Sequence, residues 1–224
     1  MGFRSGAFMK YDLMIKGGTI ADGSGSASFV ADVGIKDGLI AAVGELDGEA
    51  TKTIDAKGYL VTPGFVDIHT HFDGQVTWDS DLAPSCYHGV TTIVMGNCGV
   101  GFAPAAPDKH DFLIEVMDGV EDIPGTALHE GINWNWESFS EYLDELDRHQ
   151  WTMDVATQVP HAAVRAYVMG DRGARNELAT EDDLEKMSAI VRDGIEAGAL
   201  GVSTSRIDAH RSSKGEIVPG TYAG

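Results

Sequence analysis

A short apolar segment that ends in two histidines sets the frame for the rest of this sequence. The run Phe65–Ile68 follows a Pro-Gly break and leads into His69 and His71. The pattern predicts a buried strand, on which alternate side chains point the same way, so both imidazoles and the Asp67 carboxylate are expected on one face. Two histidines at the polar end of an apolar strand favour metal binding over a solvated or hydrogen-bonded pair.

A cysteine follows a second apolar segment in the same way. Thr91–Met95 is rich in β-branched residues and predicts another interior strand, which leads to Gly96, Cys98 and Gly99. A cysteine thiolate is a good zinc ligand, and the glycines let the backbone pass close to an ion. Taken alone, Cys98 is more typical of a small buried apolar residue. Its position after a strand, like that of the histidines, makes it a candidate ligand.

The two segments together carry a family resemblance. The sequence GYLVTPGFVDIHTH at Gly58–His71 is similar to a motif of the amidohydrolase superfamily, and GVTTIVMGNCG at Gly89–Gly99 resembles its D-aminoacylase branch, the N-acyl-D-amino-acid deacylases. The resemblance begins at about Tyr11 and covers only the front part of the family's length. We therefore interpret the sequence as an amino-terminal fragment.

The resemblance implies an activity and a cofactor. It implies zinc-dependent hydrolysis of N-acyl-D-amino acids to a carboxylate and a D-amino acid, with His69, His71 and Cys98 holding one or two zinc ions. Zinc lowers the pKa of a bound water to about 7 and polarises a carbonyl oxygen. The family's general base and further histidine ligands are expected beyond residue 224, so the catalytic residues are unknown and the fragment alone is expected to be inactive.

The fourth expected strand agrees with a cysteine ligand. Many superfamily members carry a carboxylated lysine there as a bridging metal ligand, and the segment Ala199–Arg206 contains no lysine. The resemblance implies that in the deacylase branch the cysteine after the second strand takes over as ligand. The missing lysine therefore strengthens the assignment of Cys98.

The length limits how much of the family's fold this chain contains. A (β/α)8 barrel takes about 250 residues, whereas this chain has 224 residues in all. We expect an α/β fold in two parts. Residues 1–62 are expected to form the amino-terminal part of a small β-sandwich, and residues 63–224 about the first four strands of a truncated TIM-type (β/α)8 metal-dependent hydrolase barrel.

Residues 11–62 predict short strands and turns without chemistry of their own. Asp37-Gly38 is a hairpin signal, because such turns need a positive φ that these residues tolerate. Gly17-Gly18 predicts a second turn between two strands. The role expected for this region is structural.

The remaining sequence predicts helices between strands. Met153–Val159 is the third expected strand. Thr180–Asp183 has the pattern of a capping box that begins a helix, and Gly198 ends that helix. Other expected segments are short helices at Asp79–Gly89, around Phe112–Met117 and over Trp136–Leu146, with a loop from Gly119 to Asn133.

Polar residues after the third and fourth strands are candidates for substrate contacts. His161 and Arg165 follow the third strand, and the planar fork of an arginine matches a carboxylate. Ser203, Ser205 and Arg206 lie at the top of the fourth. For Arg165, a position on a helix surface is an equally good interpretation.

Composition narrows the range of partners. The net charge of −19 argues against nucleic acid and anionic membranes. Two cysteines make a disulfide framework improbable, and Met1–Phe8 lacks the apolar core of a signal peptide. We expect a cytoplasmic protein that binds a small N-acyl amino acid, and a homo-oligomer stays open.

Two other interpretations remain. One is a different amidohydrolase of the superfamily, such as a hydantoinase-like enzyme that opens cyclic amides, although the Gly-Asn-Cys-Gly motif weighs against it. The other is a non-catalytic metal-binding half-barrel that works through a partner chain. An open half-barrel exposes a strand edge, which favours association.

Overall fold

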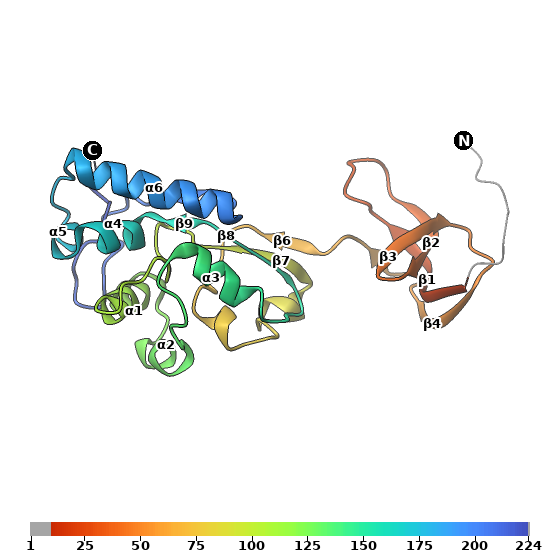
Figure 1. Ribbon diagram of the computed structural model, residues 1–224. Coiled ribbons are helices and arrows are strands. Elements are labelled where there is room, and N and C mark those ends of the chain that lie inside the picture. Colours follow the sequence, from red (N-terminus) through yellow and green to blue (C-terminus); the bar gives the residue numbers. More distant parts are fainter. Residues whose placement is uncertain (1–9, 224) are drawn as a thin grey trace. The chain divides into compact units, whose positions relative to one another are not determined.

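The computed structural model of the chain describes residues 10–223. They belong to two compact units, one that ends at Pro63 and one that begins at Gly64 (Figure 1). Residues 1–9 and 224 lie outside the described part, and with them the expectation about a signal peptide. None of the described helices is both long and apolar enough to cross a membrane.

The first unit is a sheet of short strands. Its order is β3-β2-β1-β4, with the short β5 also paired to β1. Strands β1 and β2, and β2 and β3, are antiparallel, whereas β4 and β5 run parallel to β1. The bounds are β1 Lys10–Ile20, β2 Phe29–Lys36, β3 Leu39–Gly44, β4 Glu49–Asp55 and β5 Leu60–Val61.

The two turn predictions in this unit have different outcomes. Asp37 and Gly38 have φ of 51° and 75°, as a two-residue hairpin turn between β2 and β3 requires. The turn expected at Gly17-Gly18 is wrong, because β1 continues through both residues. Gly17, at a φ of 69°, forms a bulge where the register with β2 shifts, so one strand contains what the sequence pattern divides into two.

The second unit consists of open parallel sheets with helices between the strands. Strands β6 (Phe65–Asp67), β7 (Val90–Met95) and β8 (Asp154–Thr157) form one sheet in that order. Beyond Gln158, β9 (Val159–Pro160) pairs in parallel with β10 (Val202–Ser203). The described residues therefore form a mixed α/β fold with no closed barrel.

The helices of this unit lie in the connections between strands. Figure 1 shows α6 running alongside α4 and β9. The bounds are η1 Gln75–Thr77, η2 Ser85–His88, α1 His110–Glu121, α2 Gly125–Gly131, α3 Phe139–Leu146, α4 His161–Met169, α5 Asp171–Ala174 and α6 Glu181–Ala197.

One apolar core joins the central strand to the helices. Its members include Ile93 and Met95 of β7, which are fully buried. They share the cluster with residues of α1, α3 and α4. Other large and fully buried side chains of this unit include Phe102, Ile114, Met117, Leu128, Tyr142 and Val159. This packing fixes the carboxyl end of β7, which leads to the cysteine of the site described below.

The strand that precedes the histidines is shorter and more exposed than its sequence predicts. It ends at Asp67, so both histidines lie beyond it, and Phe65, Val66 and Ile68 are 63%, 58% and 71% exposed. The expected burial is wrong because β6 is the edge strand of its sheet, and no described element covers its faces. An apolar run has the same pattern whether or not its covering layer is present.

The predicted helices are confirmed unevenly. The capping box of α6 forms as expected, with Thr180 Oγ1 accepting from the Asp183 backbone N–H. The helix at Asp79–Gly89 is reduced to the single 3-10 turn η2, closed by Gly89 at a φ of 85°. The loop predicted between Gly119 and Asn133 is wrong in part, because α2 lies within it.

Candidate metal centre

Three side chains from two strand ends converge in the second unit. His69 and His71 follow β6, and Cys98 follows β7. One donor atom of each lies within 4.8 Å of the other two. His69 Nε2 is 3.3 Å from Cys98 Sγ, and the two imidazole rings are 5.4 Å apart between centroids. Neighbouring parallel strands bring these residues together although 27 to 29 positions separate the cysteine from the histidines in the sequence.

The ring of His71 is enclosed and has no hydrogen bond. Its side chain is 12% exposed, and neither Nδ1 nor Nε2 has a hydrogen-bond partner in the described part of the chain. The Glu121 carboxylate comes within 3.1 Å of Nε2, although not along a hydrogen-bond direction. Burial, together with the nearby His69 and His210, lowers the pKa of His71 to about 4. The ring is therefore neutral near pH 7 and keeps a lone pair for an electrophile.

Acidic groups surround the thiol. Burial raises the pKa of Cys98, and the charges of Glu121 and Asp73 raise it further. Asp73 is itself 2% exposed, its Oδ2 has no hydrogen-bond partner, and burial raises its pKa to about 7. Perturbed carboxyl groups of this kind concentrate at functional sites. A divalent cation would offset this local excess of negative charge and favour the thiolate.

A buried amide fixes the loop that carries the cysteine. Asn97 Nδ2 donates to the carbonyl oxygens of Thr70 and Val94 at 3.2 and 2.9 Å, and Oδ1 accepts from Gln158 Nε2 at 2.9 Å. These bonds link the ends of three successive strand segments. The position of Cys98 relative to the histidines therefore depends on its sequence neighbour Asn97.

Ser203 supports the same loop from β10. Its hydroxyl donates to the Gly96 carbonyl oxygen and accepts from the Gly99 backbone N–H at 2.9 Å. The predicted substrate contact is thus engaged with the backbone on both sides of Cys98. Ser205, also predicted to contact substrate, lies 3.0 Å from His210 Nδ1 through its Oγ.

The other predicted substrate contacts gather at a neighbouring place. His161 begins α4, and its Nδ1 is 2.9 Å from Thr204 Oγ1. Arg165 lies one turn further on and is 3% exposed, so the alternative of a helix-surface position is wrong. Arg206 is exposed and donates to the Ala223 carbonyl oxygen. His161, Arg165 and Arg206 line one pocket.

The donor set fits zinc. Two imidazoles and one thiolate are typical zinc ligands, and three protein ligands leave a coordination position open. His71 has ring nitrogens without a hydrogen bond among the described residues, so one of them can bind an ion. The nearby carboxylates of Glu121 and Asp73 add negative charge that attracts a cation.

Sequence reasoning missed three residues of this site. Asp73 could have been found by its spacing, two positions after His71. Asn97 lies within the Gly-Asn-Cys-Gly motif, but the pattern indicates a role only for the cysteine beside it. Glu121 lies 50 positions from His71, and its only sequence signal is an acidic residue at the carboxyl end of a helix, where the helix dipole disfavours it.

The comparisons with known proteins come together on one family. Residues 52–216 match the amidohydrolase family, and the chain belongs to it. Among relatives, the D-aminoacylase of Alcaligenes xylosoxydans xylosoxydans is 34% identical over 211 residues, which are 93% of this chain and 41% of that protein. The N-acyl-D-glutamate deacylase of the same organism is 35% identical over 196 residues, 87% of this chain and 37% of the relative. The chain thus spans about two fifths of the length of these relatives.

Solved structures agree. A D-aminoacylase with a binuclear metal centre matches at a TM-score of 0.75 and 33% identity, over 96% of this chain and 40% of that one. The N-acyl-D-glutamate deacylase from Bordetella bronchiseptica, complexed with zinc and a phosphonate inhibitor, matches at a TM-score of 0.74 and 35% identity, over 88% and 38%. The described fold is therefore that of the corresponding two fifths of a deacylase.

Proposed function

We propose that this chain is part of a zinc-dependent deacylase that hydrolyses the amide bond of N-acyl-D-amino acids. The observation that carries the proposal is the meeting of His69, His71 and Cys98 within 4.8 Å, in a chain similar to such deacylases over most of its length. We propose further that residues 63–224 belong to about the first four strands of a truncated (β/α)8 barrel, and residues 1–62 to part of a β-sandwich.

In this proposal the chain contributes one wall of the metal site. His69, His71 and Cys98 hold one or two zinc ions. Bound zinc supplies an activated water and a polarised carbonyl oxygen. No described residue is assigned as general base; that role falls to a part of the family's length that these residues do not cover.

Other residues of the chain position the ligands. Asn97 and Ser203 hold the cysteine loop against the ends of the neighbouring strands. The Glu121 carboxylate lies 3.1 Å from Nε2 of His71, and a small rotation of the ring would form the hydrogen bond by which a carboxylate orients a zinc-binding histidine. Asp73 contributes negative charge behind the thiol. A ligand set held in this way needs little rearrangement when zinc binds.

The experiment that tests the metal site compares the two cysteines of the chain. Zinc content is measured by elemental analysis on the 224-residue protein and on Cys98→Ala and Cys86→Ala. Cys86 is the matched control, because it packs against the apolar core and is not part of the ligand cluster. Loss of zinc in Cys98→Ala alone supports the site, whereas retention in both variants contradicts it.

The activity is tested separately. Amine release from N-acetyl-D- and N-acetyl-L-amino acids is measured with ninhydrin for the 224-residue chain and for a form extended to the family's length. We expect D-selective release from the extended form and none from the chain alone. Zinc binding without hydrolysis by the extended form would favour a non-catalytic metal-binding protein.

A further inference from the structure

A pocket of about 520 Å³ opens beside the metal centre. Helix α4, the start of α6, the end of β10 and the segment up to Ala223 form its walls. Asn176 holds that last segment, because its Nδ2 donates to the carbonyl oxygens of Ile217 and Val218, and its Oδ1 accepts from the Gly220 N–H at 2.9 Å. The pocket is therefore built from several fixed elements, and its volume is within the range of small-molecule sites.

One end of this pocket is cationic and has no counter-ion among the described residues. Among residues 10–223, no carboxylate oxygen lies within 4 Å of a charged nitrogen of His161, Arg165 or Arg206. All three side chains line this pocket, and burial together with the nearby charges of Arg165 and Arg206 lowers the pKa of His161, so the two arginines carry the positive charge. In a chain of net charge −19, such a group is unexpected unless an anion joins it.

Arg165 gives the strongest indication of an anion site. Its side chain is 3% exposed, and Nη2 donates to the Glu177 carbonyl oxygen at 2.7 Å, but the buried Nε has no hydrogen-bond partner among residues 10–223. The Glu177 carboxylate is turned away and pairs with Arg175 at 3.0 Å. The charge of Asp183 acts on Arg165, but the Asp183 carboxylate forms its ion pair with Arg172 and lies more than 4 Å from the Arg165 guanidinium. A buried guanidinium without a directly paired carboxylate is costly, and a bound carboxylate would relieve that cost.

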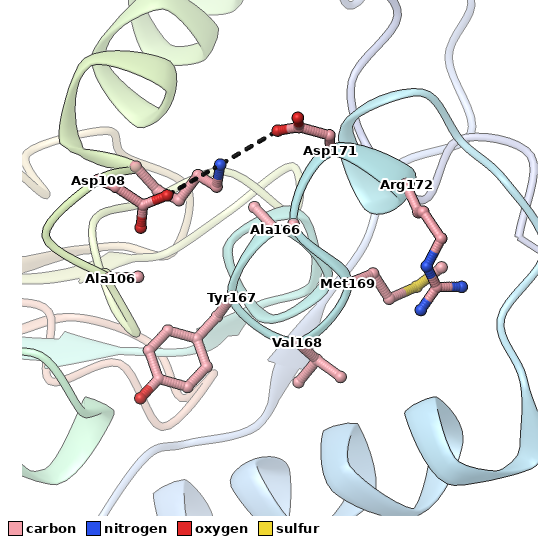
Figure 2. A pocket seen from close by; sticks show the side chains of 10 residues that line it. Ala106, Asp108, Ala166, Tyr167, Val168, Met169, Asp171 and Arg172 are labelled. Carbon is pink, nitrogen blue, oxygen red and sulfur yellow. Dashed lines mark hydrogen bonds and ion pairs between the residues drawn. The ribbon is translucent and has the colours of Figure 1, made fainter.

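A second hollow beside α4 shows the contrast. Figure 2 shows this hollow, of about 470 Å³, with Asp108 and Asp171 at its edge. Both carboxylates pair with Lys109, at 3.2 and 3.1 Å, and Arg172 pairs with Asp183 at 2.8 Å. Its lysine and its arginine each have a carboxylate partner, so among residues 10–223 this hollow offers an anion no unpaired cation.

The remaining wall of the first pocket is apolar. Leu178, Leu184, Met187 and Val202 line it, and Leu184 and Val202 are 52% and 46% exposed. From the unpaired cations at one end and the aliphatic wall beside them, we propose that this pocket binds a carboxylate on a short aliphatic chain. Two sources share this chemistry: the carboxylate end of an N-acyl amino acid, and a free aliphatic acid.

The pocket borders the metal centre through Gly99. The Ala162 backbone N–H donates to the Gly99 carbonyl oxygen at 2.8 Å, and a Cβ at Gly99 would lie 3.1 Å from the Thr204 Cα. His161 and Thr204 thus flank the residue that follows Cys98. A molecule bound in this pocket lies next to the loop that carries Cys98. The residues that would bind it are different from the candidate zinc ligands.

The test measures binding of defined probes to the 224-residue chain by calorimetry. Butanoate is expected to bind at least tenfold more tightly than butanamide, because only the carboxylate forms charge-assisted hydrogen bonds. Each methylene added from acetate to hexanoate is expected to tighten binding about fourfold. Equal affinity for butanoate and butanamide would overturn the proposal. So would equal affinity for inorganic phosphate and butanoate, combined with the same affinity for every acid from acetate to hexanoate.

Variants locate the site. Arg206→Gln, at the exposed rim, is expected to weaken butanoate binding at least fivefold, and Arg165→Gln more. Arg211→Gln is the matched control, because Arg211 is exposed and donates to the Gly215 carbonyl oxygen outside this pocket. Since Arg165→Gln can lower stability, Arg206→Gln decides: unchanged binding there would place the ligand elsewhere and contradict the proposal.

Further arms separate the two sources and the metal. Tighter binding of N-acetyl-D-leucine than of hexanoate would identify the substrate's own carboxylate as the ligand, and the reverse order a free acid. The same titrations on Cys98→Ala are expected to give unchanged affinities. The pocket then stands even where zinc binding fails, whereas loss of butanoate binding in Cys98→Ala would show that the carboxylate binds at the metal site instead.

Discussion

The His71 ring and the Glu121 carboxylate approach within 3.1 Å behind the candidate metal centre. Glu121 ends α1, where the helix dipole disfavours a carboxylate, and burial raises its pKa. Among the described residues no lysine or arginine pairs with it. The ionised form of Glu121 is therefore disfavoured at this position. The group that it approaches, the His71 ring, is a candidate zinc ligand.

We expect Glu121→Gln to weaken zinc binding by about 10- to 100-fold, because the ring of His71 loses the carboxylate that orients it. The measurement is competition for zinc with a chromogenic chelator. Glu115→Gln is the control, since Glu115 lies on the same helix but pairs with Lys214. Equal zinc affinities for the two variants would show that Glu121 does not act on the site.

The second prediction concerns Asn97. Asn97→Ala removes three hydrogen bonds and leaves the buried carbonyl oxygen of Thr70 with one partner fewer. We expect the free energy of unfolding to fall by about 2 kcal/mol and zinc affinity to fall with it, measured by urea unfolding and by chelator competition. Asn133→Ala, at an exposed position, should change neither. A loss of stability with unchanged zinc affinity would mean that Asn97 supports the fold but not the ligand geometry.

The meeting of His69, His71 and Cys98 was predictable from short stretches of sequence. Parallel strands end at one edge of a sheet, and residues directly after β6 and β7 therefore meet there. The two central residues of the β2–β3 turn and the cap of α6 are equally local, since each depends on the φ or the side chain of one or two residues. Such features are contained in short stretches of sequence.

The features that were missed depend on distant partners. Glu121 reaches His71 because α1 and β7 belong to one apolar core, and no short pattern encodes that packing. Helix α2 was not predicted because Gly125 and Gly131 at its ends are typical of turns, although Leu128 between them is buried in the core. The exposure of Phe65 depends on whether another element packs over β6. The sequence of the strand itself carries no information about that element.

The third prediction concerns acid stability. Backbone and side-chain bonds from Thr180 and the ion pair with Arg172 lower the pKa of Asp183 to about 2. Its pKa in the unfolded chain is about 3.9, so the charged form stabilises the native state above that pH. This stabilisation is lost as the pH falls from about 4 to about 2.

The test is urea unfolding as a function of pH. Asp183→Asn is expected to be less stable than the parent chain at pH 7, with most of the difference gone by pH 2. Asp182→Asn is the control, because Asp182 is exposed and pairs only with Lys186. A difference between parent and Asp183→Asn that persists unchanged at pH 2 would assign the effect to packing and not to the charge.

The last prediction compares two glycines with similar backbone angles. Gly96 and Gly215 have φ of 74° and 84°, where any other residue is strained by about 1–2 kcal/mol. A Cβ at Gly96 would fall on the Gln158 carbonyl oxygen, whereas one at Gly215 would meet nothing within 4 Å. We expect Gly215→Ala to cost about 1 kcal/mol and Gly96→Ala about 3 kcal/mol, because the second variant must also move a neighbouring backbone segment. Since Gly96 precedes the cysteine loop, Gly96→Ala should also lose zinc, and equal losses of stability in the two variants would show that the close approach to Gln158 contributes nothing.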